Sequence, residues 1–245
     1  MGREQREKTM SDIKALIKDL VAANRILGNE GICDALGHIS VRNPDNPDTY
    51  FLSRSRSPEL VEEGDILEFN LDNSPVTPTD TPIYIERPIH GMVYQARPDV
   101  MSVIHNHCEE LLPFGITKTP MRPAVHTARR IGVCVPVWDI RENFGDTDLL
   151  VTTNDQGADM CACMGDAKAV LMRGHGCTVT GKSIRDAVHS AIGMKKNARA
   201  ILTGLELGEV TYLTEGEVNA SSPGQTNLRG HDRAWEYLCR RAGVA

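Results

Sequence analysis

Two histidines, two positions apart, close an apolar run that is typical of a buried strand. The run is Met101-Ser-Val-Ile-His-Asn-His107. Side chains alternate faces along a strand, so His105 and His107 are expected to point the same way. Two imidazoles on one face at the end of a strand form a rigid pair of nitrogen ligands for a transition-metal ion.

A third imidazole and a carboxylate occur in settings that suit the same site. His175 lies in the glycine turn Arg173-Gly-His-Gly176, which follows the apolar run Ala169–Met172. Glu86 comes just before Pro88, and proline is favoured in the first turn of a helix. A lone histidine here would more often be an ordinary polar residue at a strand end. The pair combined with the glycine turn favours a divalent-metal site with room for a substrate.

Two neighbours of these residues have ordinary structural interpretations. Cys108 follows His107 but falls on the opposite face if the strand continues, so it is expected to be a small buried residue. His90 comes one helical turn after Glu86, so it could contact the metal ligands without binding the ion itself. A solvated helix residue is the favoured interpretation of His90.

The elements that position these residues follow from hydrophobic spacing. The best-defined helix begins at Ser183, which forms a capping pair with Asp186, and ends at Gly208. Other helices are expected at 9–29, 87–96, 123–131 and 155–164, with a short final helix around Trp235. Strands are expected at 37–42, 50–53, 65–69, 101–107, 132–137 and 210–213. Helices and strands mix without regular alternation, which predicts an α/β fold around a largely antiparallel or mixed sheet.

The composition restricts the class of protein. The chain has 245 residues, a net charge of −6 and no basic run, which argues against a nucleic-acid partner. Its apolar stretches are short, so no membrane span is expected, and the charged N-terminus is unlike a secretory signal. Seven cysteines in no disulfide pattern suggest buried thiols in a reducing cytoplasm. No linker divides the chain, so residues 1–245 are expected to form a single domain.

The motifs together resemble the class II aldolase/adducin family over about residues 10–215. The resemblance is carried by GHISVR at 37–42, the segment Glu86–His90, HNH at 105–107 and RGHG at 173–176. It implies an α/β/α domain with a mostly antiparallel central sheet, and a homotetramer with active sites at subunit interfaces. It also implies one zinc or manganese ion per chain, bound by His105, His107 and His175. Glu86 would be the acid/base and can also touch the metal.

The sequence departs from the sugar-phosphate aldolases of that family at the expected phosphate site. Those enzymes have Asn at the position of His38, a small Thr/Gly loop, and a Ser-Ser pair before the glutamate. Here the loop is Ser53-Arg-Ser-Arg-Ser57 and the pair is Tyr84-Ile85. Arginine forks suit planar carboxylates rather than a phosphate cradle of small hydroxyls.

With these differences and the motifs GHIS and IERPIHG, the sequence resembles a decarboxylase branch of the family. Its members act on hydroxylated aromatic dicarboxylates, such as dihydroxyphthalates and the 3-hydroxy-2-methylpyridine-4,5-dicarboxylate of vitamin B6 degradation. The resemblance makes an aromatic carboxylate the expected small-molecule partner. Substrate-binding roles then fall on His38, Ser40, Arg54, Arg56 and Arg87. For Arg54 or Arg56 taken singly, a solvated loop residue is about as good an interpretation.

Three functions remain open at this point. The first is a metal-dependent carboxy-lyase. The second is a class II aldolase or epimerase on a sugar derivative, and the missing phosphate pocket argues against it. The third is a non-catalytic, adducin-like interaction module, and the intact set of three histidines with Glu86 argues against that.

Overall fold

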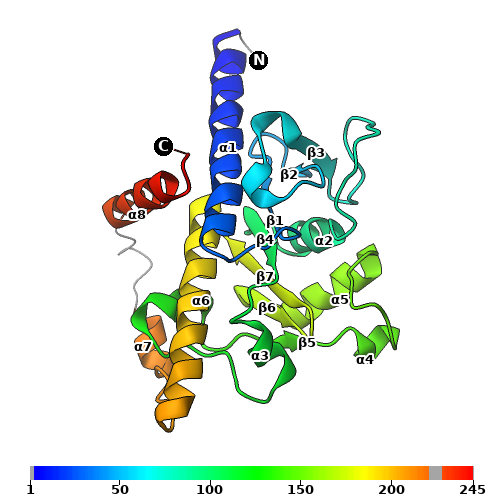
Figure 1. The fold of residues 1–245 in the computed structure, drawn as a ribbon. Coiled ribbons are helices and arrows are strands. Elements are labelled where there is room, and N and C mark those ends of the chain that lie inside the picture. The colour runs from blue at the N-terminus through cyan, green and yellow to red at the C-terminus, as the bar shows by residue number, and fades with distance from the viewer. Residues whose placement is uncertain (1–2, 221–227, 245) are drawn as a thin grey trace.

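A seven-stranded sheet lies at the centre of the computed structural model, which describes residues 3–220 and 228–244 (Figure 1). The strand order is β3-β2-β1-β4-β7-β6-β5. Every neighbouring pair is antiparallel except β5 and β6, which are parallel. The mostly antiparallel sheet expected from the sequence is therefore confirmed. The strands are β1 His38–Arg42, β2 Thr49–Ser53, β3 Ile66–Asn70, β4 Ser102–Asn106, β5 Val137–Trp138, β6 Ala169–Met172 and β7 Gly176–Gly181.

Helices cover both faces of the sheet and create two separate cores. The long helices α1 (Arg3–Asn29) and α6 (Ile184–Leu207) pack on one face, and α2 (Pro88–Ala96) and α5 (Asn154–Met164) pack on the other (Figure 1). This is the expected α/β/α arrangement. The remaining helices are α3 Leu112–Ile116, α4 Arg141–Phe144, α7 Glu215–Asn219 and α8 Leu228–Arg241, with 3₁₀ turns η1 Pro58–Leu60, η2 Glu63–Asp65 and η3 His126–Ile131.

Strand β1 sends its two sets of side chains into different cores. Ile39 and Val41 belong to the core under α1 and α6. His38 and Ser40 lie on the opposite face, where both contact a side chain of α2. β1 pairs with β4 so that His38 stands opposite His105. The register therefore places polar side chains of two strands together beneath α2.

Several predicted elements agree with the structure, and others are wrong. Helices α1, α2, α5 and α6 match their predictions within a few residues at most ends, and Ser183 caps α6 by accepting from the N–H of Asp186. The helix expected at 123–131 is only the 3₁₀ turn η3. In the run 132–137, only Val137 belongs to a strand and Val135 forms an isolated bridge with Met121, because Gly132 has a positive φ and Pro136 has no N–H to donate. Residues 210–213 form no strand, and β7 was not predicted.

The described helices also bear on the membrane and cysteine predictions. Across 3–220 and 228–244, every helix is too short or too polar to cross a membrane. All seven cysteines are free thiols. Cys108 is buried in the core on the α1 and α6 side, as expected. Cys134 and Cys163 are exposed, contrary to the expectation of buried thiols.

Candidate metal centre

Two turns at one end of the sheet bring distant histidines together. β4 and β7 are antiparallel, with Asn106 opposite Cys177. His107 directly follows β4 and His175 directly precedes β7, so both lie at the same sheet end. Gly176 is required by this approach, because a Cβ there would lie 2.3 Å from the carbonyl oxygen of Asn106.

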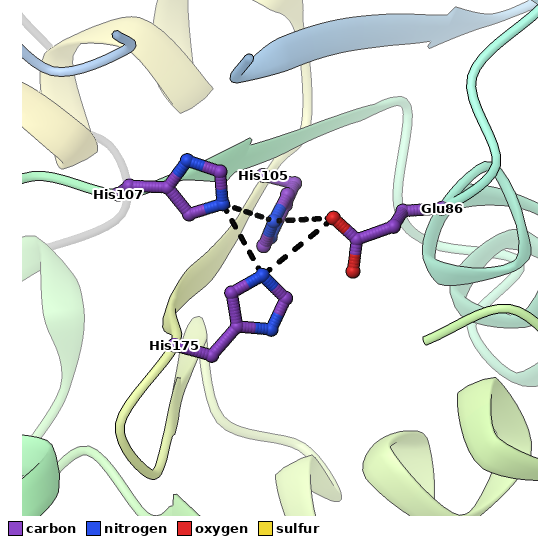
Figure 2. Close-up of side chains that lie close together, drawn as sticks. All are labelled: Glu86, His105, His107 and His175. Carbon is purple, nitrogen blue, oxygen red and sulfur yellow. Dashed lines mark hydrogen bonds and ion pairs between the residues drawn. The ribbon is translucent and has the colours of Figure 1, made fainter. Parts of the chain in front are cut away.

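Four side chains converge on one point at this end of the sheet, as Figure 2 shows. The Nε2 atom of His107 lies 3.1 Å from that of His105 and 3.2 Å from that of His175. The Oε2 atom of Glu86 lies 3.5 Å from the Nε2 atoms of both His105 and His175. Ligands about 2.1 Å from a tetrahedral ion are about 3.4 Å apart. The spacing and the donor set therefore fit one divalent ion.

Asp34 fixes the orientation of His107 from behind. His107 Nδ1 lies 3.0 Å from Asp34 Oδ1, and the N–H groups of Leu36 and Gly37 donate to the same oxygen at 2.9 Å. Burial raises the pKa of Asp34, but hydrogen bonds with Leu36 and His107 lower it overall. The ionised carboxylate keeps the proton of His107 on Nδ1, so the Nε2 lone pair faces the cluster. Sequence reasoning missed Asp34, which is distant in the chain and carries no motif.

The other two imidazoles have less support from the protein. His105 Nδ1 and His175 Nδ1 are buried, and neither has a hydrogen-bond partner among the described residues. Of the three imidazoles, His107 is thus the one whose tautomer the surrounding residues set most firmly.

Glu86 enters the cluster as a carboxylate held at both oxygens. The N–H of Val151 donates to Oε1 at 3.0 Å, which leaves Oε2 toward the imidazoles. Burial raises the pKa of Glu86, but the hydrogen bonds with His105 and His175 outweigh it and keep the pKa below its usual range. Pro88 begins α2 at its first helical position, two residues after Glu86. The start of α2 therefore delivers an ionised carboxylate to the site.

A pocket of about 610 Å³ opens onto the cluster. Glu86, His107 and His175 are among its lining residues. Its volume is in the usual range for small-molecule sites. Its other lining residues are of two kinds: polar or polar-tipped ones, namely His38, Ser55, Arg56, Ser57 and Tyr84, and apolar ones, namely Ala35, Leu36, Ile83, Ile85 and Leu150.

Comparison with known proteins identifies the family. The model of the class II aldolase and adducin N-terminal domain matches residues 18–202. The chain belongs to this family. Decarboxylase tropJ of Talaromyces stipitatus is 36% identical over 248 residues, which cover 91% of this chain and 92% of that protein. The 3,4-dihydroxyphthalate decarboxylase of Arthrobacter keyseri is 30% identical over 247 residues, covering 92% and 93%.

The relatives and a solved structure confirm three predictions. The curated relatives place this class II aldolase family member in the decarboxylase branch, so it is an enzyme of the carboxy-lyase class. L-Fuculose 1-phosphate aldolase from Glaciozyma antarctica PI12 superposes with a TM-score of 0.76 and 19% identity, covering 96% of this chain and 90% of that one. That likeness confirms the class II aldolase fold.

The three arginines predicted to bind substrate have different positions in this family member. Asp65 bridges two of them, because its Oδ1 lies 2.6 Å from Arg54 Nε and its Oδ2 lies 2.6 Å from Arg56 Nη1. Of this pair, only Arg56 lines the pocket. Arg87 donates to the carbonyl oxygens of Asn73 and Tyr84 and lies outside the pocket lining. The structure thus brings Arg56 to the site and uses the other two elsewhere.

His38 and Ser40 also separate from one another. His38 lines the pocket, whereas Ser40 is fully buried and bonds to Nδ1 of His90 at 2.6 Å. The expectation that His90 is solvated is wrong, because α2 is enclosed between the sheet and α5 and His90 has no exposed surface. The spacing of His90 and Tyr94, which puts both on one helix face, was the signal for this interior position.

Proposed function

We propose that this enzyme catalyses the metal-dependent decarboxylation of a hydroxylated aromatic dicarboxylate. The substrate would be a dihydroxyphthalate or 3-hydroxy-2-methylpyridine-4,5-dicarboxylate. The observation that carries the proposal is Arg56, a guanidinium held by Asp65 in the same pocket as the four-residue cluster. The printed names of two relatives as 3,4-dihydroxyphthalate decarboxylases support the substrate class.

The resident ion would be Mn²⁺ or Zn²⁺, since imidazole nitrogens with a carboxylate oxygen suit either. His105, His107 and His175 would hold it, with Glu86 Oε2 alongside. When bound, such an ion supplies Lewis-acid stabilisation of negative charge on a substrate oxygen.

Glu86 would move the proton that the reaction requires. Decarboxylation replaces a carboxyl group on a ring carbon by hydrogen, so that carbon must gain a proton. The ionised carboxylate at Oε2 can accept the proton of the neighbouring ring hydroxyl and pass it to the ring carbon. The carbon–carbon bond then breaks, CO₂ leaves, and its electron pair restores the aromatic ring. The phenolate that remains takes a proton from water.

Arg56 would hold the carboxylate that the product retains. Among the described residues, its salt bridges with Asp65 and Glu62 use Nη1 alone, so its Nε–H and Nη2–H groups remain for a substrate carboxylate. Tyr84 further fixes the loop, because its hydroxyl donates to the carbonyl oxygen of Arg56. With the retained carboxylate clamped and the ring against Leu36 and Leu150, only one carboxylate reaches the cluster.

A substrate panel tests this function. The metal-reconstituted enzyme is assayed for CO₂ release from hydroxylated phthalates and pyridine dicarboxylates, and for aldehyde release from sugar phosphates. CO₂ release from a dicarboxylate should be much faster than from the monocarboxylate that has the same ring hydroxyl groups but lacks the retained carboxylate. Aldol cleavage without CO₂ release would contradict this proposal and favour an aldolase or epimerase that acts on a sugar derivative.

Arg56 and Arg54 provide a matched pair of variants for the specificity. Both bind Asp65, but only Arg56 lines the pocket. Arg56→Ala removes a charge-assisted contact of about 1.5 to 3 kcal/mol, so KM should rise by roughly 10- to 100-fold with little change in kcat. Arg54→Ala should change KM much less. Equal effects of the two substitutions would contradict a direct contact with Arg56.

The same proposal includes a homotetramer with active sites at subunit interfaces. Leu36 and Ile85, at the pocket, are 68% and 57% exposed, and a neighbouring subunit would cover such apolar side chains. Light scattering at micromolar concentration tests this, and a monomer would contradict it. A cytoplasmic location is proposed from the free thiols.

A further inference from the structure

Behind the metal centre, four buried side chains form a continuous chain of hydrogen bonds. His38 Nδ1 lies 2.6 Å from His90 Nε2, and His90 Nδ1 lies 2.6 Å from Ser40 Oγ. Ser40 Oγ then lies 2.7 Å from the Tyr94 hydroxyl. All four residues are buried. The chain therefore begins at the pocket, which His38 lines, and ends inside the protein at a phenol.

The two elements that carry this chain explain its regular form. His38 and Ser40 are two apart on β1 and share a face, while His90 and Tyr94 are four apart on α2 and share a face. α2 packs on that face of the sheet, so the residues of the strand and the helix alternate along the chain.

The phenol at the inner end sets the direction of every hydrogen bond. Within the described residues, Ser40 Oγ is the one acceptor within reach of the Tyr94 O–H. If Ser40 donated to Tyr94 instead, a buried phenol proton would be unpaired, at a cost of about 1 to 3 kcal/mol. Tyr94 therefore donates to Ser40, and Ser40 donates to His90 Nδ1. His90 then carries its proton on Nε2 and donates to His38 Nδ1.

The direction of these hydrogen bonds determines the tautomer of His38. Nδ1 is an acceptor, so a neutral His38 carries its proton on Nε2, on the side of the ring away from His90. Among the described residues, no hydrogen bond involves Nε2, so that N–H is available to a molecule in the pocket.

The ring is also kept neutral. His38 Nδ1 accepts a hydrogen bond from His90 Nε2–H and so carries no proton, and an imidazole protonated on Nε2 alone has no net charge. Burial lowers the pKa of His90 to about 3, so that ring is neutral as well. At the far end, burial raises the pKa of Tyr94, so the chain has no group that readily gives up a net proton. His38 can thus donate a hydrogen bond but is a poor source of a proton, which leaves proton transfer to Glu86.

We propose that His38 is a neutral hydrogen-bond donor, through Nε2–H, to an anionic oxygen of the substrate, and that His90, Ser40 and Tyr94 are positioning residues that hold this tautomer. That this oxygen belongs to an aromatic acid rests on the proposed function. The tautomer of His38 does not depend on the proposed function. A preorganised donor aimed at developing charge is the usual form of electrostatic stabilisation in an active site.

Nitrogen NMR of the zinc-loaded protein tests the tautomer directly. The histidines are labelled with ¹⁵N, and the His38 signals are identified by their loss in His38→Asn. Long-range proton–nitrogen correlations distinguish a protonated from a bare ring nitrogen. We expect a protonated Nε2 and a bare Nδ1 on both His38 and His90. A protonated Nδ1 on His38, or an imidazolium at neutral pH, would overturn the proposal.

Alanine variants of two buried serines distinguish a positioning role of the hydrogen-bond chain from a role in packing alone. Ser40→Ala interrupts the chain, so the two His38 tautomers should mix and kcat should fall about tenfold, the equivalent of one hydrogen bond, with KM nearly unchanged. Ser102→Ala is the matched control. Ser102 is equally buried on the adjacent strand β4, and its hydroxyl donates to the Ser40 carbonyl oxygen rather than to His90. This control should keep both the native tautomer and kcat.

Equal losses of kcat in the two serine variants, with the His38 tautomer unchanged, would overturn the positioning role. If Ser40→Ala does not fold, the measurement on the native protein still decides the tautomer. If the protein decarboxylates no aromatic acid, the proposed function fails, and the NMR result remains a separate test of the chain.

Discussion

Two groups of histidines lie side by side in this protein and are built in opposite ways. In the candidate metal centre, the Nε2 atoms of His105, His107 and His175 converge on one point, with neighbouring separations of 3.1 and 3.2 Å. In the buried chain, His38 and His90 meet through different nitrogens at 2.6 Å, and the other nitrogen of His90 lies 2.6 Å from Ser40 Oγ. The two groups touch where His38 packs against His105, with ring centroids 5.2 Å apart.

The difference shows how the same side chain is assigned to different chemistry. A linear arrangement lets donors and acceptors alternate, so protons alone satisfy both nitrogens of His90 and the Nδ1 atom of His38. A convergent arrangement cannot do this, because three like nitrogens face each other and a single ion satisfies all of their lone pairs. Each prediction below tests one side of this contrast.

The largest effect is expected when a histidine is replaced by glutamine in each group and the two variants are compared. His107→Gln should abolish metal binding and lower activity by at least about a thousandfold, because one of three nitrogen ligands is lost. His90→Gln should retain one ion per chain. Metal content by mass spectrometry after dialysis, together with CO₂ release, measures both. Full metal occupancy in His107→Gln, or metal loss in His90→Gln, would remove the distinction between the groups.

Glu86 belongs to the convergent group but is assigned proton transfer. Glu86→Gln keeps the size of the side chain and its acceptor for the Val151 N–H, yet cannot carry the proton. Turnover should fall by about a hundredfold or more, while substrate still binds. Single-turnover kinetics with a separate binding measurement distinguishes the two steps. Near-normal turnover would exclude Glu86 as the proton carrier.

Asp34 supports the convergent group from outside. Asp34→Asn keeps the shape but removes the charge that holds the His107 proton on Nδ1, so metal affinity should weaken by about 10- to 100-fold. Competition with a chelator measures the affinity. Activity at saturating metal should recover largely, which distinguishes Asp34 from a direct ligand. An unchanged affinity would show that His107 needs no such support.

The smallest effect concerns stability in acid and the linear group. The pKa of His90 in the folded protein is about 3, below its value of about 6.5 in the unfolded chain. Between these two pH values, the unfolded chain binds a proton at His90 and the folded protein does not, so acid favours unfolding. This residue alone should reduce the free energy of unfolding by about 1.4 kcal/mol per pH unit between pH 6 and pH 4. Denaturant titrations of native protein and His90→Gln test it, and identical pH slopes would contradict a neutral, buried His90.

The sequence by itself determined the parts of this protein that depend on local spacing. The period of two along a strand put His105 and His107 on one face, and the glycines around His175 indicated a tight turn. Ser183 with Asp186 predicted the start of α6, which the structure confirms. The motifs were also sufficient to predict the family and its decarboxylase branch, which the comparisons confirm.

Only the tertiary structure decided which side chains support these residues. Asp34 reaches His107 across 73 positions of the chain, and His90 reaches His38 across 52, so neither contact has a local pattern. Asp65 binds Arg54 and Arg56 alike, yet the course of the loop brings only Arg56 to the pocket. Periodicity tells which face a side chain occupies, but strand register and helix packing determine what lies opposite that face. The partner of each imidazole, and with it the choice between binding an ion and passing a hydrogen bond, follows from that packing.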